Sequence, residues 1–88
     1  NSVNFPEILL GANDGNRVLV IHENVPSMVS AISAAIGSRH INIDSMQNKS
    51  RKEMAITVLE LDDHPDEALI AEIRALPGVI RVRTFEAQ

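Results

Sequence analysis

The residues of this chain best suited to chemistry are one histidine and two asparagines, His22, Asn24 and Asn42. An imidazole both donates and accepts hydrogen bonds, and an asparagine amide carries donors and an acceptor on one side chain. His22 and Asn24 stand in a run that reads IHENVP from residue 21 to residue 26. The first two stand where a predicted strand passes into a predicted helix, and Asn42 stands at the start of the next predicted strand, an arrangement that suits the binding of a small polar ligand.

Each of these three residues also has a purely structural explanation, and spacing alone leaves both open. His22 can be a polar strand end. Asn24 can cap the free N–H groups of a helix start, or those N–H groups and the positive end of the helix dipole can receive a ligand carboxylate. Asn42 can fit a turn after the helix, because asparagine tolerates the left-handed conformation.

Other kinds of chemistry find little support in the sequence. No serine stands in a nucleophile-elbow context, and the chain has no cysteine, which removes thiol nucleophiles and thiolate metal sites. The histidines His22, His40 and His64 form no His-x-x-x-His pair. We therefore expect a module with no catalytic residues, no metal and no cofactor of its own.

Composition narrows the class of partner. Twelve acidic residues against eight basic ones give a formal net charge of −4, which disfavours binding to nucleic acid. Two Phe, with no Trp or Tyr, leave little surface for stacking bases. No apolar run approaches the roughly 20 residues that span a bilayer, and no signal peptide is recognisable. We expect a soluble, cytoplasmic protein that binds neither nucleic acid nor membrane.

The beginning of the chain predicts a linker. Residues 1–16 carry Pro6, Gly11, Gly15 and an Asn-Asp-Gly-Asn cluster, which is turn chemistry, and they show no helical or strand period. We expect them to lead from a preceding catalytic or substrate-binding domain of a longer protein. The folded unit is expected to cover residues 17–88.

The first strand and helix must position His22 and Asn24. Residues 17–22 form a nearly continuous apolar run that predicts a central strand, with His22 on the same side as Val18 and Val20. Apolar residues at positions 25, 28, 29, 32 and 36 then predict a helix that buries one face. Asn24 is its expected N-cap, and Gly37 lies close to its expected end.

The remaining pattern predicts two strands, a helix and a final strand. Residues 41–50 alternate loosely, residues 48–53 read as a polar hairpin loop, and residues 54–61 read as the returning strand. Acidic residues then precede a helix with apolar positions 69, 70, 73 and 76, which Pro77 and Gly78 end. Residues 79–85 predict the last strand.

The predicted order βαββαβ indicates an α+β fold. Right-handed crossovers place both helices on one face of a four-stranded antiparallel sheet, the ferredoxin-like arrangement. The second strand is then an edge, with main-chain donors and acceptors open to another copy. We therefore predict a homodimer that pairs through the edge strand at residues 41–50.

Three segments resemble a known family. Residues 20–26 (VIHENVP), 41–43 (INI) and 76–83 (LPGVIRVR) resemble the ACT domain at the C-terminus of bacterial D-3-phosphoglycerate dehydrogenases. The resemblance implies a ferredoxin-like ACT domain that binds L-serine, the end product of L-serine biosynthesis. It implies allosteric feedback inhibition of an NAD-dependent oxidoreductase whose NAD binds elsewhere in the polypeptide.

The resemblance also assigns roles by position. It implies that His22 and Asn24 contact the amino acid from one subunit. Asn42, with the backbone of Ile41 and Ile43, would reach the ligand from the other subunit.

The chain departs from the family pattern at two positions where the family commonly has glycine. These positions hold Ser27, after the helix-start proline, and His40, before the second strand. The hydroxyl of Ser27 can contact the ligand, but its side chain also narrows the space. Two alternatives therefore stay open: a structural oligomerisation domain without a ligand, and a sensor of another small amino acid.

Overall fold

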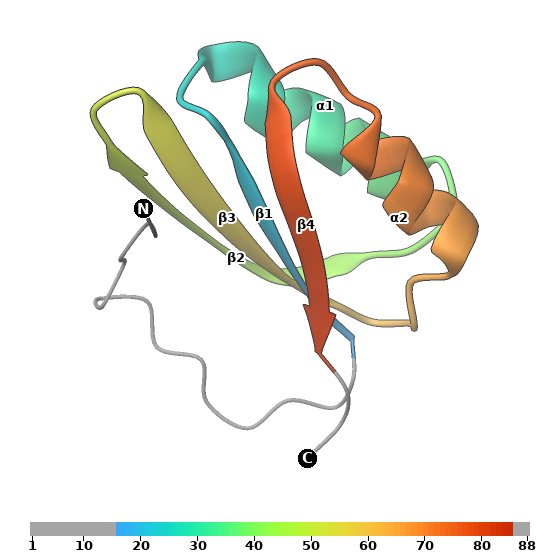
Figure 1. Ribbon diagram of the computed structural model, residues 1–88. Helices are drawn as coiled ribbons and strands as arrows, with labels where there is room; N and C mark the ends of the chain where they lie inside the picture. The colour runs from blue at the N-terminus through green and yellow to red at the C-terminus, as the bar shows by residue number, and fades with distance from the viewer. Residues whose placement is uncertain (1–15, 86–88) are drawn as a thin grey trace.

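The computed structural model describes residues 16–85, which form a sheet with two helices on one of its faces (Figure 1). The predicted linker therefore lies, except for Asn16, outside the described residues. The elements follow in the order β1 (Arg17–Glu23), α1 (Pro26–Gly37), β2 (Ile43–Arg51), β3 (Met54–Leu61), α2 (Glu67–Arg74) and β4 (Val79–Phe85). The four strands lie in the order β2-β3-β1-β4, and each neighbouring pair is antiparallel. This arrangement confirms the predicted α+β ferredoxin-like fold.

The main core lies between the helices and the sheet. Alternate residues of β1 and β3 meet the buried faces of the two helices there, because successive side chains of a strand point to opposite faces of the sheet. Burying each Leu, Ile or Val side chain contributes about 1.5–3 kcal/mol. The buried members of this cluster are Val18, Val20, Met28, Ile32, Ala35, Ile36, Leu59, Leu61, Leu69, Ile73 and Val82. Within residues 16–85, neither helix is long and apolar enough to cross a membrane.

Strand β2 is longer at its end than the sequence predicted. The prediction of a polar loop at residues 48–53 is wrong, because β2 continues to Arg51, which pairs with Met54 of β3. Only Lys52 and Glu53 form the turn, and Lys52 takes a φ of 58°. Since every residue of β2 after Ile43 is exposed, polar side chains carry no burial cost there. The strand also begins at Ile43 rather than at residue 41.

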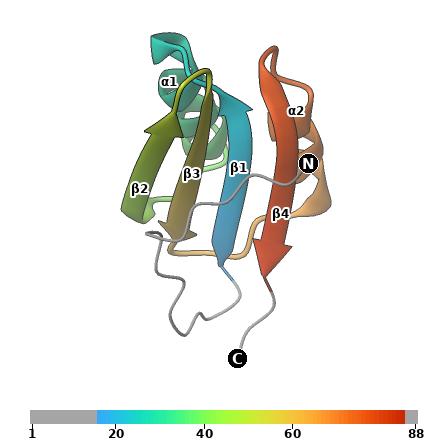
Figure 2. The same ribbon diagram turned by 60° about the vertical axis from the view of Figure 1, so that its left-hand side comes forward.

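The direction of β2 relative to β1 decides at which end of the sheet the residues before and after each strand lie. β2 and β1 are both antiparallel to β3, so they run parallel to each other. The start of β2 therefore lies at the end of the sheet where β1 begins, and its last residue lies where β1 ends. β2 is an edge strand, as predicted, and β4 is the opposite edge (Figure 2).

Candidate functional site

Asn24 lies in the turn between β1 and α1, but it does not cap the helix. Its backbone N–H donates to the carbonyl of Glu53 at 2.9 Å, and its Nδ2 donates to the carbonyl of Lys52 at 3.1 Å. The predicted capping role is therefore wrong. Asn24 instead ties the end of β1 to the β2–β3 turn, which lies beside it because the three strands are paired.

The residue that does occupy the N-cap position is Val25, in an extended conformation with a φ of −128°. No side chain caps α1, its first turn holds no acidic residue, and Pro26 brings no N–H. The first N–H groups of α1, at the positive end of the helix dipole, therefore receive no side-chain cap from within residues 16–85. Ser27, also in this first turn, is exposed.

An open hollow of about 380 Å³ lies against this helix start. Its lining combines the amide of Asn24, the apolar side chain of Val25 and three charged residues of both signs, and these residues come from two separate turns. A small zwitterion suits such a surface, because the helix start attracts a carboxylate and acidic side chains attract an ammonium. The lining residues are Glu23, Asn24, Val25, Lys52 and Glu53.

His22 is not among the residues that line this hollow. Its side chain lies among the core, with an exposure of 1%, and its strand neighbours Val18 and Val20 share that buried face, as predicted. Nδ1 of His22 lies 2.7 Å from the carbonyl oxygen of Glu23, and Nε2 lies 2.7 Å from Oγ1 of Thr57. Both ring nitrogens are therefore engaged within the chain.

Sequence reasoning missed two polar residues that belong with His22. Thr57 is fully buried, and its Oγ1 also accepts a hydrogen bond from Nδ2 of Asn48 at 2.9 Å. The signal that could have found Thr57 is its position as a hydroxyl within the apolar run 55–59 of β3. Its partner lies 35 positions away in the sequence, so no local pattern reveals the contact.

Asn42 lies at the opposite end of the sheet. Its backbone N–H donates to Oδ1 of Asp62 at 2.9 Å, and its Nδ2 donates to Oδ2 of Asp62 at 3.2 Å. The nine residues of β2 separate it from the hollow, a span of about 30 Å at strand spacing. Within one chain, the structure therefore does not bring Asn42 together with His22 and Asn24. The neighbouring side chains of Ile41 and Ile43 are half-buried against the core.

The turn before β2 contains His40, one of the two positions at which the family commonly has glycine. His40 takes a φ of 61°, the left-handed conformation that glycine adopts without strain. The left-handed residue is thus His40 and not Asn42. Arg39 next to it donates from Nη2 to Oε1 of Glu72 at 2.8 Å, and this hydrogen bond raises the pKa of Arg39.

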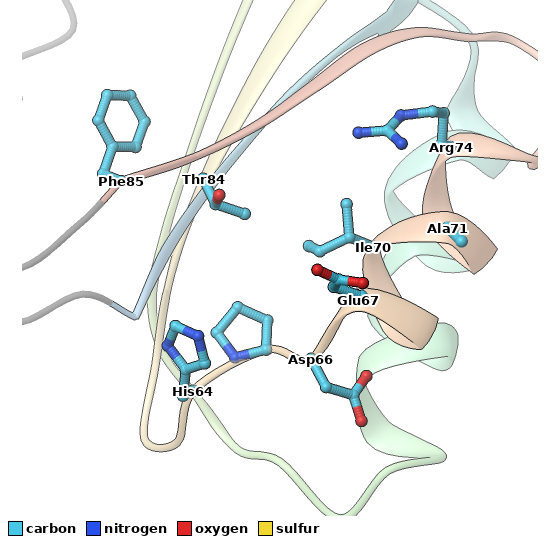
Figure 3. Close-up of a pocket in the computed structure, with 9 residues that line it drawn as sticks. His64, Asp66, Glu67, Ile70, Ala71, Arg74, Thr84 and Phe85 are labelled. Carbon is cyan, nitrogen blue, oxygen red and sulfur yellow. The ribbon is translucent and has the colours of Figure 1, made fainter.

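A second hollow, of about 550 Å³, lies between α2 and β4 and holds none of the predicted site residues (Figure 3). It lies beside β4, at the edge of the sheet opposite β2. Glu67, Ile70 and Arg74 approach it from the helix, and Thr84 approaches from the strand. Among residues 16–85, no group of three or more His, Cys, Asp or Glu side chains could hold a metal ion.

Comparisons with known proteins agree with this fold. The ACT domain model matches residues 16–78. The chain is 31% identical over 85 residues to D-3-phosphoglycerate dehydrogenase of Escherichia coli K12, which covers 94% of this chain and 21% of that protein. It is 27% identical over 86 residues to the Haemophilus influenzae enzyme, covering 97% of this chain and 21% of that protein. The chain thus spans about a fifth of these relatives, and it matches their C-terminal region.

The solved structures give the same answer about the fold. The crystal structure of the ACT domain from GTP pyrophosphokinase of Chlorobium tepidum superposes with a TM-score of 0.66 at 17% identity, covering 78% of this chain and 94% of that one. At this identity the likeness concerns the fold alone. The family match, the strand order and the two helices on one face lead to one conclusion: the chain belongs to the ACT domain family.

Proposed function

We propose that this chain is a regulatory domain that binds L-serine in a seam between two copies. In the longer polypeptide, serine bound there restrains an NAD-dependent D-3-phosphoglycerate dehydrogenase, whose NAD binds outside this chain. ACT domains generally bind small amino acids, and the relatives that match this chain are D-3-phosphoglycerate dehydrogenases. The observation that carries the proposal is the position of Asn24 and Asn42 at opposite ends of the sheet, joined by an edge strand.

Pairing of two edge strands would bring these asparagines together. When β2 pairs antiparallel with β2 of a second copy, a two-fold axis relates the copies. The start of the partner's β2 then lies beside the end of the first β2. Because β2 and β1 run parallel, the partner's Asn42 arrives at the end of the sheet that holds Asn24. Two equivalent sites result, each completed by the other copy.

The hollow supplies the chemistry that an amino acid requires. The ligand carboxylate would lie at the start of α1, where no side chain caps the helix. The carboxylates of Glu23 and Glu53 in the lining would attract its ammonium group. The exposed hydroxyl of Ser27 can hydrogen-bond the hydroxyl of L-serine. His22 would act indirectly, because it is 1% exposed: its ring would hold the backbone of Glu23, which lines the hollow.

One observation favours the alternative of an assembly domain without a ligand. One N–H of each side-chain amide is engaged within its own chain, that of Asn24 with Lys52 and that of Asn42 with Asp62. A ligand would then have to bind through the second N–H or the oxygen of each amide, in the orientation that these bonds fix, or displace the bonds. Ser27 likewise favours a preference for another small amino acid, since its side chain occupies space beside the ligand.

Calorimetric titration distinguishes these functions. We expect saturable binding of L-serine, weaker binding of D-serine and glycine, and a loss of at least tenfold in affinity for both Asn24→Ala and Asn42→Ala. Thr84→Ala, at an exposed position of β4 on the sheet edge opposite β2, is the control and should bind as the unaltered chain does. A folded dimer whose thermal midpoint does not rise with any amino acid would refute the sensor and leave the assembly domain.

A further inference from the structure

We propose that Asn48, Thr57 and His22 form a hydrogen-bond relay between the edge strand β2 and the turn that lines the hollow. In this relay Thr57 is a positioning residue, because it holds the His22 ring that in turn holds the backbone of Glu23. The claim about the ring stands on the contacts within one chain. The claim that the relay serves ligand binding rests on the proposed function.

The contacts form an unbroken chain across three strands. Asn48 on β2 donates to Oγ1 of Thr57 on β3 at 2.9 Å, and that oxygen lies 2.7 Å from Nε2 of His22 on β1. Nδ1 of His22 lies 2.7 Å from the carbonyl oxygen of Glu23. The strand register explains the alignment, since Thr57 lies opposite Asn48 on one side and opposite Val20 on the other.

For a neutral His22 ring, the acceptors fix the direction of every bond. A carbonyl oxygen only accepts, so Nδ1 of His22 must carry the hydrogen. In the neutral ring Nε2 is then an acceptor, and the Thr57 hydroxyl must donate to it. Oγ1 of Thr57 keeps its lone pairs for Asn48, which donates from its amide. Each group thus finds its partner, and removing the hydroxyl of Thr57 deprives Nε2 of the hydrogen bond that this hydroxyl donates.

The last bond of the relay acts on the turn beside the ligand. The carbonyl oxygen of Glu23 accepts from Nδ1 of His22 and also from the backbone N–H of Val25 at 2.9 Å. This shared oxygen therefore holds the backbone on both sides of Asn24. Glu23, Asn24 and Val25 all line the hollow, so a displaced ring changes the shape of the hollow.

The first bond of the relay lies at the strand that would meet a second copy. Asn48 is exposed on β2, and its amide is the outermost group of the relay. Pairing of β2 with a partner strand restrains Asn48, and this restraint favours the relayed arrangement of Thr57 and His22. Ligand binding at the hollow and pairing of the edge strands should then strengthen each other, because coupling between two sites is reciprocal.

Nitrogen NMR of the histidine ring tests the relay without any ligand. In the unaltered chain we expect His22 to show a protonated Nδ1 and an unprotonated Nε2. Thr57→Val removes the hydroxyl at nearly equal volume, so we expect Nδ1 to stay protonated against the Glu23 carbonyl, while the Nε2 signal shifts because it loses its hydrogen bond and the backbone amide signals of Asn24 and Val25 shift with it. Thr57→Ser should restore the original spectrum. Thr84→Val, at an exposed position of β4, is the matched control and should leave the ring unchanged.

Asn48→Ala provides a second route to the same answer if Thr57→Val does not fold. The change lies on the exposed edge strand, and we expect the His22 ring signals to shift because Thr57 loses a hydrogen-bond donor. An Nε2 signal that is unchanged in Thr57→Val would overturn the relay, as would an unchanged ring spectrum in Asn48→Ala.

Titration with L-serine then tests the positioning role. We expect Thr57→Val to lose about tenfold in affinity and Thr84→Val to lose none. A shifted Nε2 signal with unchanged affinity would overturn the role of Thr57 in positioning. If the unaltered chain binds no L-serine, the proposed function fails, and the relay is still decided by the Nε2 signal of His22 and the amide signals of Asn24 and Val25.

Discussion

At the scale of single residues, two glycines have opposite requirements. Gly78 has a φ of 97°, and a Cβ there would lie 2.7 Å from Sδ of Met28. We expect Gly78→Ala to lower the free energy of unfolding by about 1–3 kcal/mol through backbone strain. Gly37, the last residue of α1, has open space around it, so Gly37→Ala should raise the free energy of unfolding by about 0.5–1 kcal/mol.

Urea unfolding of the two glycine variants measures both changes on one scale. The contrast matters because both substitutions add the same methyl group. Equal effects of Gly78→Ala and Gly37→Ala would contradict the assigned conformation of the turn before β4.

The individual site residues show how far local sequence reasoning reaches. His22, Asn24 and Asn42 could be singled out by their chemistry, because few side chains combine donors with acceptors. Their partners could not. Asn24 bonds to Lys52, 28 positions away in the sequence, while local reasoning offered a helix cap or a ligand contact. A partner that tertiary folding supplies leaves no mark on the neighbouring sequence.

At the scale of elements, the two helices begin differently. Asp66 caps α2, where its Oδ1 accepts from the backbone N–H of Leu69 at 2.8 Å. Val25 holds the same position in α1 and caps nothing. This difference leaves the start of α1 open for a ligand carboxylate, at the expense of helix stability.

Val25→Asp should separate stability from binding. An aspartate at the N-cap can accept from the first-turn N–H groups, so we expect the free energy of unfolding to rise by about 1 kcal/mol. Val25 is 42% exposed, so little apolar burial is lost. The new carboxylate would occupy the place of the ligand carboxylate, and L-serine affinity should fall at least tenfold. Calorimetry and urea unfolding check the two effects; tighter binding of L-serine would contradict the proposed ligand orientation.

The elements themselves follow closely from their patterns. Strands β3 and β4 have the predicted bounds, because a buried face imposes its period on the sequence. The helices bury most of the predicted stripes, but Val25, which was also predicted to be buried, is 42% exposed because it precedes the first turn of α1. Strand β2 departs from this rule. Its residues from Asp44 onward are exposed, so no apolar alternation marks where it ends, and pairing with β3 decides instead.

At the scale of the whole molecule, each edge of the sheet carries one exposed apolar side chain. Met46 on β2 is 44% exposed, and Ile80 on β4 is 56% exposed. If copies pair through β2, a charge at Met46 would be buried or repelled in the seam. Sedimentation velocity should therefore show that Met46→Glu shifts the chain towards monomers, while Ile80→Glu leaves the dimer intact. The reverse result would place the seam at β4.

The central claim is that each ligand site takes Asn24 from one copy and Asn42 from the other, and mixing two inactive variants tests it most directly. Dimers of Asn24→Ala alone, or of Asn42→Ala alone, contain no intact site. A mixed dimer contains one site in which the unaltered Asn24 meets the partner's unaltered Asn42. Calorimetric titration of the equilibrated mixture with L-serine should therefore recover binding at the affinity of the unaltered chain, with one site per mixed dimer. A mixture of confirmed heterodimers that binds no better than either variant alone would contradict the shared site.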